Sequence, residues 1–293
     1  MSQSPSEEHA SSSLLKYSWA HHHLVALKEA VDVFEKGEPA VMRPEFKPKR
    51  PGYDFRFHVL RVPQRNVALM AGDVVGCLRD ALDHLIYELT VHYSGIPDEG
   101  HKTAWPICEY RNDWAMRSSK GRISKRAGER KVHGIHPKAQ AMVYRLQPFY
   151  MKRSPGPHRR HPLWILDELR NIDRHRRLSI VAATSQEFEV MATRHNRAIT
   201  IVRRESRRGA PKDGAVVERI WLTPGAVQRD MTVEAVPSCK LVIDETSSGQ
   251  SRAPLMETME ALARHVRTVL ANFLDFEPDS VQQFVKGEPW VEV

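Results

Sequence analysis

The stretch Leu78-Arg79-Asp80-Ala81-Leu82-Asp83-His84-Leu85-Ile86-Tyr87 decides how the rest of the chain is interpreted. Its apolar residues, with Val75 before them and Leu89 after them, recur at the spacing of one helix face. The pattern predicts a helix over 70–93 that Gly95 and Pro97 end. The same helix carries an arginine, two aspartates and a histidine within six positions. Charges in so apolar a helix need partners, water or a chemical role.

These charged side chains point in different directions around the predicted helix. Each residue of a helix is rotated by about 100° around the helix axis relative to the one before it. Measured from Val75, the centre of the apolar stripe lies at about 310°, Arg79 at about 40° and His84 at about 180°. Asp83 follows Arg79 by four positions, so we expect the two to pair on the flank of the buried face. Because Arg79 and His84 diverge, a site that contains both needs a second helix.

A helix predicted over 162–177 is the candidate for that second helix, with Pro162 at an early position where its missing N–H is harmless. It ends in Asn171-Ile172-Asp173-Arg174-His175-Arg176-Arg177. In this interpretation Asp173 and His175 lie close to Asp83 and His84, and the four side chains form one site.

Such a site has a defined chemistry. Arg79, Asp83, His84, Asp173 and His175 would be its catalytic residues. A histidine transfers protons near neutral pH, and an arginine stabilises a phosphate-centred transition state. This set suffices to cleave RNA through its own 2′-hydroxyl, with no metal and no cofactor. The supporting residues would be Asp80, Arg174 and Arg176.

Two other interpretations of the same residues remain open. In the first, Arg79–Asp83 and His84–Asp173 are structural pairs that hold two helices in register. In the second, two histidines and two carboxylates hold a metal ion, although their spacing is not a standard one for metal ligands.

The element 79–84 resembles the Arg-x4-6-His signature of the HEPN superfamily. That superfamily consists of small helical bundles and includes many metal-independent ribonucleases of toxin–antitoxin, CRISPR and anti-phage systems. The resemblance implies catalytic roles for Arg79 and His84, with Asp80 in support. Arg170, Asn171 and His175 match the same pattern.

About half of the chain also resembles an uncharacterised family of bacterial proteins, which brings no known activity. The family usually has Lys where Arg174 stands, and commonly Asn where Cys77 stands. The shared features are Gly72-Asp73, Leu78-Arg79, Ala81-Leu82-Asp83-His84-Leu85, Pro106-Ile107, Gln147-Pro148 and Asp173-Arg174-His175-Arg176.

Positive charge is concentrated in one part of the chain. The net charge is +8, but residues 111–177 alone contain 18 Lys and Arg against 5 Asp and Glu, a local balance of +13. Such a block is the electrostatic footprint expected of a nucleic-acid binder, here RNA. The alternative is a solvated surface of a basic protein.

The composition is that of a globular protein, with 41% hydrophobic and 27% charged residues. No apolar run approaches the length needed to span a bilayer, so we expect no membrane association. Residues 1–13 lack the pattern of a signal peptide and are expected to be disordered. Three widely spaced cysteines favour a reducing cytoplasm.

The fold class expected is α+β. A helical core with basic loops is predicted over 14–177, a β-rich segment over 178–252, and a last helix over 253–276 that packs on the core. A tail follows at 277–293. The segment 41–52 is predicted to be a loop and 53–62 a strand. Further strands are expected at 178–183, 188–192, 198–204, 216–222, 231–236 and 240–244.

Three functions follow in order of preference. The first is a HEPN-like, RNA-directed protein, with metal-independent ribonuclease activity of a defence or toxin-type system as its catalytic form. The second is a non-catalytic interaction module in which the charged pairs are structural. The third is a small-molecule or metal enzyme. A homodimer is compatible with each of them.

Overall fold

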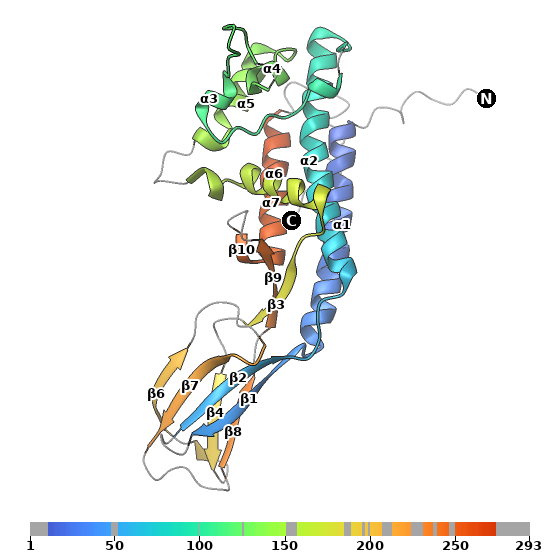
Figure 1. The fold of residues 1–293 in the computed structure, drawn as a ribbon. Helices are drawn as coiled ribbons and strands as arrows, with labels where there is room; N and C mark the ends of the chain where they lie inside the picture. The colour runs from blue at the N-terminus through green and yellow to red at the C-terminus, as the bar shows by residue number, and fades with distance from the viewer. Residues whose placement is uncertain are drawn as a thin grey trace, which may run out of the picture. The chain divides into compact units, whose positions relative to one another are not determined.

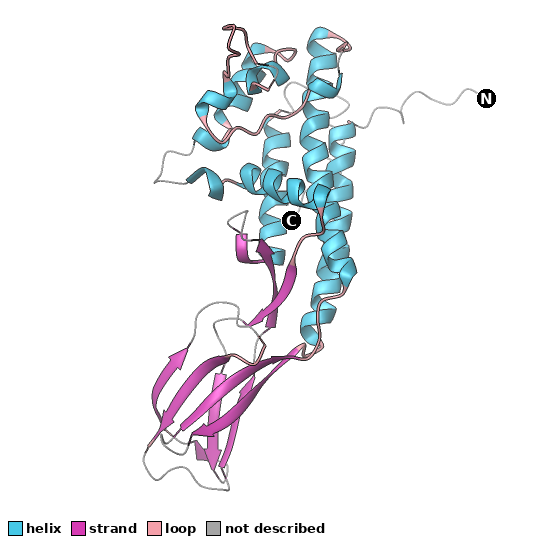
Figure 2. Cartoon of the chain, in the orientation of Figure 1, coloured by secondary structure: helices cyan, strands magenta, loops and turns pink. Residues whose placement is uncertain are grey.

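The computed structural model shows an α+β fold, with helices and antiparallel sheets, and all the strands in the described residues precede the last helix (Figures 1 and 2). The chain divides into two compact units. The helical unit comprises Met1–Ala26, Leu69–Leu178 and Glu257–Val293, and the β unit comprises Leu27–Ala68 and Ser179–Met256. The structure describes residues 11–47, 52–98, 100–124, 126–150, 157–184, 189–194, 197–198, 200–206, 213–223, 231–236, 239–245 and 250–273.

The long helices are α1 (Ser12–Lys36), α2 (Arg65–Ser94), α6 (Pro162–His175) and α7 (Leu255–Asn272). The last three confirm the helices predicted over 70–93, 162–177 and 253–276. The shorter helices are α3 (Arg111–Trp114), α4 (Gly128–Lys131), α5 (Pro137–Arg145), η1 (Gly100–Lys102), η2 (Pro148–Tyr150) and η3 (Pro157–Arg160). The predicted tails at 1–10 and 277–293 lie outside the described residues, but Ser12 and Ser13, expected in the first tail, already belong to α1. No helix in the described ranges is both long and apolar enough to cross a membrane.

The apolar stripe of α2 forms the centre of the helical core. Val75, Leu78, Leu82 and Leu85 are each fully buried. The other helices contribute matching apolar faces to the unit, which include Leu163, Leu166 and Leu169 of α6 and Met259, Leu262, Val266 and Val269 of α7. The apolar stripe predicted for α2 is therefore the face that is buried in the helical core.

The β unit contains three antiparallel sheets. Their strand orders are β1-β2-β7-β6, β10-β9-β3 and β5-β4-β8. Phe55 and Phe57 of β2 are fully buried and pack with Ile220 and Leu222 of β7. The strands are β1 (Ala40–Lys47), β2 (Gly52–Val59), β3 (Ile180–Thr184), β4 (Glu189–Arg194), β5 (Arg197–Ala198), β6 (Ile201–Ser206), β7 (Val216–Leu222), β8 (Met231–Val236), β9 (Cys239–Glu245) and β10 (Gln250–Pro254).

The predicted loop at 41–52 is wrong over most of its length. Residues 40–47 form β1, which pairs with β2 from Ala40↔Val59 to Lys47↔Gly52. Pro44 argued against a strand, but β1 is an edge strand, where a residue without an N–H is tolerated. Because β2 also pairs with β7, both strands belong to the β unit, although they lie inside the predicted core of 14–177.

The six later predicted strands correspond to β3, β4, β6, β7, β8 and β9. The two that were missed are β5, which has 2 residues, and β10, which pairs with β9 through a register shift between Ser251 and Ala253. A strand so short, or interrupted by a bulge, has no alternating pattern to detect.

The buried stripe of α2 predicts a contrast between two leucines on the same helix. Leu82→Ala removes a fully buried side chain, so we expect the free energy of unfolding to fall by about 2–5 kcal/mol in urea denaturation. Leu69→Ala is the matched control, because Leu69 is 52% exposed, and it should change stability by about 0.5 kcal/mol or less. Equal losses in the two variants would contradict the packing described for α2.

Candidate functional site

Two glycines one turn apart determine how α6 lies against α2. A Cβ atom at Gly72 would lie 2.2 Å from Asp173 Oδ1, and one at Gly76 would lie 3.0 Å from Arg170 Nη1. The missing side chains therefore let charged groups of α6 rest directly on the α2 backbone. This contact fixes which residues of the two helices can meet.

Arg79 is enclosed and bonded on three sides. Its Nη1 donates to Asp83 Oδ1 at 2.7 Å, and its Nη2 donates to the carbonyl oxygen of Trp105 at 2.8 Å. Its Nε lies 3.4 Å from Asp167 Oδ1 on α6. Only 12% of the side chain is exposed. The expected Arg79–Asp83 pair is present, within a larger set of contacts than local spacing predicts.

Asp83 completes a clamp on the connection that follows η1. Its Oδ1 accepts the backbone N–H of Trp105 at 2.9 Å, so Arg79 and Asp83 together bond both peptide groups of that residue. Burial raises the pKa of Asp83, and the neighbouring Arg79 opposes that rise. The Trp105 ring is fully buried and packs edge-to-face with Phe273, with 5.7 Å between ring centroids.

A second chain of charges connects α1, α2 and α6. Asp80 lies between Lys16 Nζ at 3.2 Å and Arg170 Nη2 at 3.9 Å. Arg170 continues to Asp173, with 3.5 Å between Nη1 and Oδ2. Burial raises the pKa of Asp173, and Arg170 lowers it. Three helices therefore share one alternating series of cations and carboxylates.

His84 has a different task from Arg79. Its Nδ1 lies 2.9 Å from Ser12 Oγ, and the same hydroxyl donates to Glu88 Oε1 at 2.6 Å. Glu88 also accepts the backbone N–H of Ser13 at 3.1 Å. A carboxylate that accepts N–H groups at the start of a helix stabilises it. His84 and Glu88, one turn apart on α2, thus hold the first turn of α1.

The predicted convergence of His84 with Asp173 and His175 does not form. Asp173 lies against Gly72, which precedes His84 by twelve positions, about 18 Å along a helix. His175, Arg174 and Arg176 are exposed at the end of α6. Helix spacing alone did not reveal that α6 meets the N-terminal half of α2, so the predicted site is split into separate contacts.

The same separation bears on the metal interpretation. Within the part of the chain that the structure describes, no group of three or more His, Cys, Asp or Glu side chains is arranged to hold a metal ion. Asp83 and His84, which were candidate ligands, have the partners given above.

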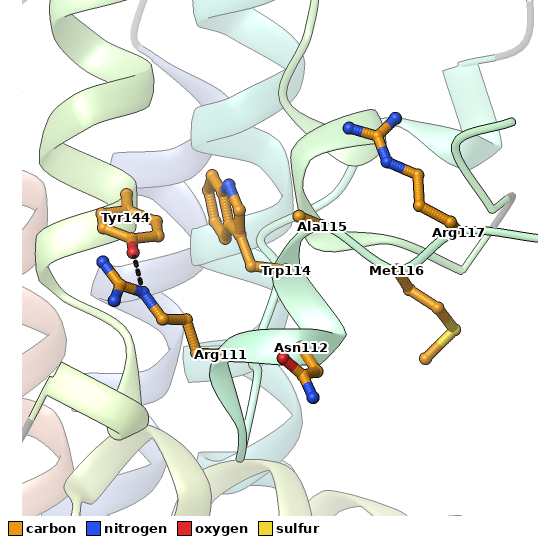
Figure 3. A pocket seen from close by; sticks show the side chains of 7 residues that line it. All are labelled: Arg111, Asn112, Trp114, Ala115, Met116, Arg117 and Tyr144. Carbon is orange, nitrogen blue, oxygen red and sulfur yellow. Dashed lines mark hydrogen bonds between the residues drawn. The ribbon is translucent and has the colours of Figure 1, made fainter. Parts of the chain in front are cut away.

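A second candidate site lies in the basic segment, and no sequence pattern predicts it. A pocket of about 500 Å³ lies between α3, the residues that follow it, and Tyr144 of α5. Figure 3 shows the side chains that line it. Its polar members are two arginines, an asparagine and a tyrosine, and its walls are otherwise aromatic or apolar. The lining residues are Arg111, Asn112, Trp114, Ala115, Met116, Arg117 and Tyr144.

Aromatic contacts hold this pocket in shape. The Trp114 and Tyr144 rings meet edge-to-face with 5.2 Å between centroids. Tyr144 also contacts Phe149 and Tyr150, at 5.2 and 5.7 Å. Arg111 Nε donates to the Tyr144 hydroxyl at 2.7 Å, drawn as the dashed line in Figure 3. Arg111 and Trp114 are about thirty positions away from Tyr144, so no local motif indicates the cluster.

Two histidines missed by the sequence reasoning form a pair, of which His161 is buried and His265 is half-buried. The rings of His161 and His265 meet edge-to-face at 5.2 Å. His161 Nδ1 accepts the backbone N–H of Leu163 at 3.2 Å and so caps α6. Burial lowers the pKa of His161 to about 4, and His265 adds to the effect. Burial also lowers the pKa of His265.

Comparisons with known proteins supply no relative from which to assign either location, because no family model, curated protein or solved structure matches the chain. The HEPN resemblance and the resemblance to a bacterial family therefore stay predictions from the sequence.

The clamp around Arg79 predicts a loss of stability when the arginine is removed. Arg79→Ala removes the donor to the Trp105 carbonyl and leaves the Asp83 carboxylate with the Trp105 N–H alone, so we expect the free energy of unfolding to fall by about 1–3 kcal/mol. Arg174→Ala, at an exposed position on α6, is the control and should stay close to wild type. A double-mutant cycle with Asp83→Asn that gives no coupling would show that the pair is not energetically linked.

The buried His161 predicts that stability depends on pH. A His161 pKa of about 4 in the folded state, against an ordinary value of 6.5, means that the unfolded chain binds the extra proton first. Stability from this group is present above pH 6.5 and is lost as the pH falls toward 4, by on the order of 3 kcal/mol in full.

Thermal unfolding between pH 7 and pH 5 measures this effect. His161→Asn keeps an N-cap acceptor but cannot titrate, so its melting temperature should fall less than that of wild type. His92→Asn, at an exposed position on α2, should follow the wild-type profile. Parallel profiles for wild type and His161→Asn would contradict the assignment.

Proposed function

We propose that the protein binds RNA through its basic segment and that its charged helix pairs are structural. The observation that carries the proposal is the exposure of that segment. Of its 18 Lys and Arg, 15 lie in the described residues and 13 of these are exposed, while Lys131 and Arg170 are half-buried. Exposed cations at this density favour phosphate contacts, since each contact releases condensed counterions.

Few carboxylates compete with RNA for these cations. In the described part of 111–150, the acidic residues are Asp113 and Glu129. Asp113 accepts the backbone N–H of Tyr110 at 3.0 Å, and Glu129 lies 3.5 Å from Arg117. The remaining exposed cations of this stretch therefore support an attractive field for a polyanion.

The surroundings of Arg79 support a structural role over a catalytic one. An arginine that stabilises a phosphate in the transition state must direct its donors at that phosphate. Arg79 directs them at Asp83 and Trp105, and His84 bonds to Ser12 on α1. Ribonuclease activity at this pair would require these contacts to break first.

RNA binding is tested with a labelled single-stranded oligonucleotide by fluorescence anisotropy. We expect affinity to fall steeply between 50 and 200 mM salt, as it does for binding dominated by phosphate contacts. Lys120→Gln/Arg122→Gln/Arg126→Gln should weaken binding and lower the salt slope. Lys28→Gln/Lys36→Gln/Arg43→Gln removes as many exposed cations elsewhere and should leave binding close to wild type. Equal effects of the two triple variants would contradict the assigned surface.

The same RNA incubated with the protein in EDTA and run on a denaturing gel separates binding from cleavage. We expect intact RNA. Cutting by wild type that disappears in His84→Asn and in Arg79→Lys would overturn the structural assignment and favour the ribonuclease predicted from the HEPN resemblance.

A further inference from the structure

We propose that the pocket lined by Trp114 and Tyr144 receives one unpaired nucleotide of an RNA strand, with the base inside and its phosphates on the surrounding arginines. The inference rests on the proposed RNA binding and names the part of RNA that is recognised. The inference is based on one observation: aromatic side chains and arginines line the same pocket (Figure 3).

The dimensions and walls of the pocket suit a flat, ring-shaped ligand. Its volume of about 500 Å³ is within the range of small-molecule sites. Trp114 and Tyr144 are half-buried and meet edge-to-face at an interplanar angle of 75°. Stacking on such side chains is the usual way in which proteins hold unpaired bases, because every base has a π-face.

The charges around the pocket indicate that the ligand carries phosphate. Arg111 and Arg117 line it, and none of the lining residues is acidic. Arg111 is held by the Tyr144 hydroxyl and so does not need to be ordered when a ligand binds. Arg117 lies 3.5 Å from Glu129, and the N–H groups of the two arginines that these contacts leave over are the donors for a phosphate.

A short hairpin continues this positive surface away from the pocket. Arg117, which lines the pocket, pairs in an isolated bridge with Ile123. Between them, the N–H of Ser118 bonds to the carbonyl of Arg122 at 2.7 Å, and Gly121 turns the chain with φ of 72°. Lys120 and Arg122 belong to this hairpin and are exposed. Phosphates of neighbouring nucleotides would meet these cations.

Asn112 gives the pocket a means of distinguishing bases. Its side-chain amide offers both a donor and an acceptor, which is the pair that reads the edge of a base. It is exposed at the pocket and makes no hydrogen bond to another described residue. A base that stacks inside would present its edge to this amide only when it is unpaired, which excludes duplex RNA from the pocket.

Binding of a short single-stranded oligoribonucleotide and of its duplex, measured by anisotropy, tests the inference. Trp114→Ala should weaken single-strand binding by about 5- to 150-fold, the usual range for loss of one stacked base, and duplex binding by less than about twofold. Trp19→Ala removes an exposed tryptophan of α1 and should change neither. Asn112→Ala, at an exposed position, should fold as wild type does and should reduce differences in affinity among homopolymers.

Tryptophan fluorescence supplies a second readout that does not depend on affinity. Single-stranded RNA should quench wild-type fluorescence, and Trp114→Phe should lose most of that quenching. If wild type binds the single strand but Trp114→Ala and Asn112→Ala bind it equally well, the pocket assignment is wrong and the proposed RNA binding stands. If wild type binds no RNA, both fail. Adenosine or uridine monophosphate could bind as tightly as the strand, with this binding abolished in Trp114→Ala. In that case the ligand of the pocket is a free nucleotide, and the proposal that it receives a nucleotide of an RNA strand is wrong.

Discussion

One guanidinium group joins the parts of the helical unit. The acceptors around Arg79 come from α2 itself, from the connection at Trp105 and from Asp167 of α6. A charge this enclosed requires acceptors in good geometry, because an unpaired buried charge costs several kcal/mol. The positions of three segments that are distant in sequence are therefore coupled to one side chain. The apolar stripe supplies most of the burial, and Arg79, together with the close contacts at Gly72 and Gly76, determines the register in which α6 packs on α2.

The same dependence explains why a ribonuclease-like spacing can arise without a nuclease centre. Arg79 and His84 are five residues apart, so they project from opposite flanks of α2, and each meets a different partner helix. Arg79 faces α6, and His84 with Glu88 holds the start of α1. In each case a polar residue on an otherwise apolar helix satisfies groups that packing would leave unbonded. An Arg-x4-His spacing is thus as compatible with two separate packing tasks as with one catalytic site.

The fold was predictable where a pattern is local. Apolar periodicity located α2 and α7, and alternation located most strands of the β unit. The β1 strand escaped because Pro44 is tolerated only at an edge, and edge position is a property of the sheet, not of the segment. Gly72, which the sequence offered only as part of a resemblance, has a physical role in the contact with Asp173.

The candidate site was predictable only in its local part. The i,i+4 spacing anticipated Arg79–Asp83, but nothing local shows that Trp105 supplies both a donor and an acceptor to that pair. His84 was assigned to the wrong helix because its partner, Ser12, lay in a segment expected to be disordered. Non-local contacts of this kind depend on how helices cross, which periodicity does not determine.

The basic segment illustrates the limit of charge counting as a functional argument. A surplus of cations indicates a polyanionic partner but does not distinguish a duplex from a single strand, because both present phosphates. The distinction requires groups that can receive a base, and these become visible only when Trp114 and Tyr144 are brought together. Their contact depends on α5 lying against α3, a packing to which Arg111 contributes through its hydrogen bond to the Tyr144 hydroxyl. The aromatic cluster, held in place by the fold, is therefore the feature that gives a diffuse positive surface a defined site.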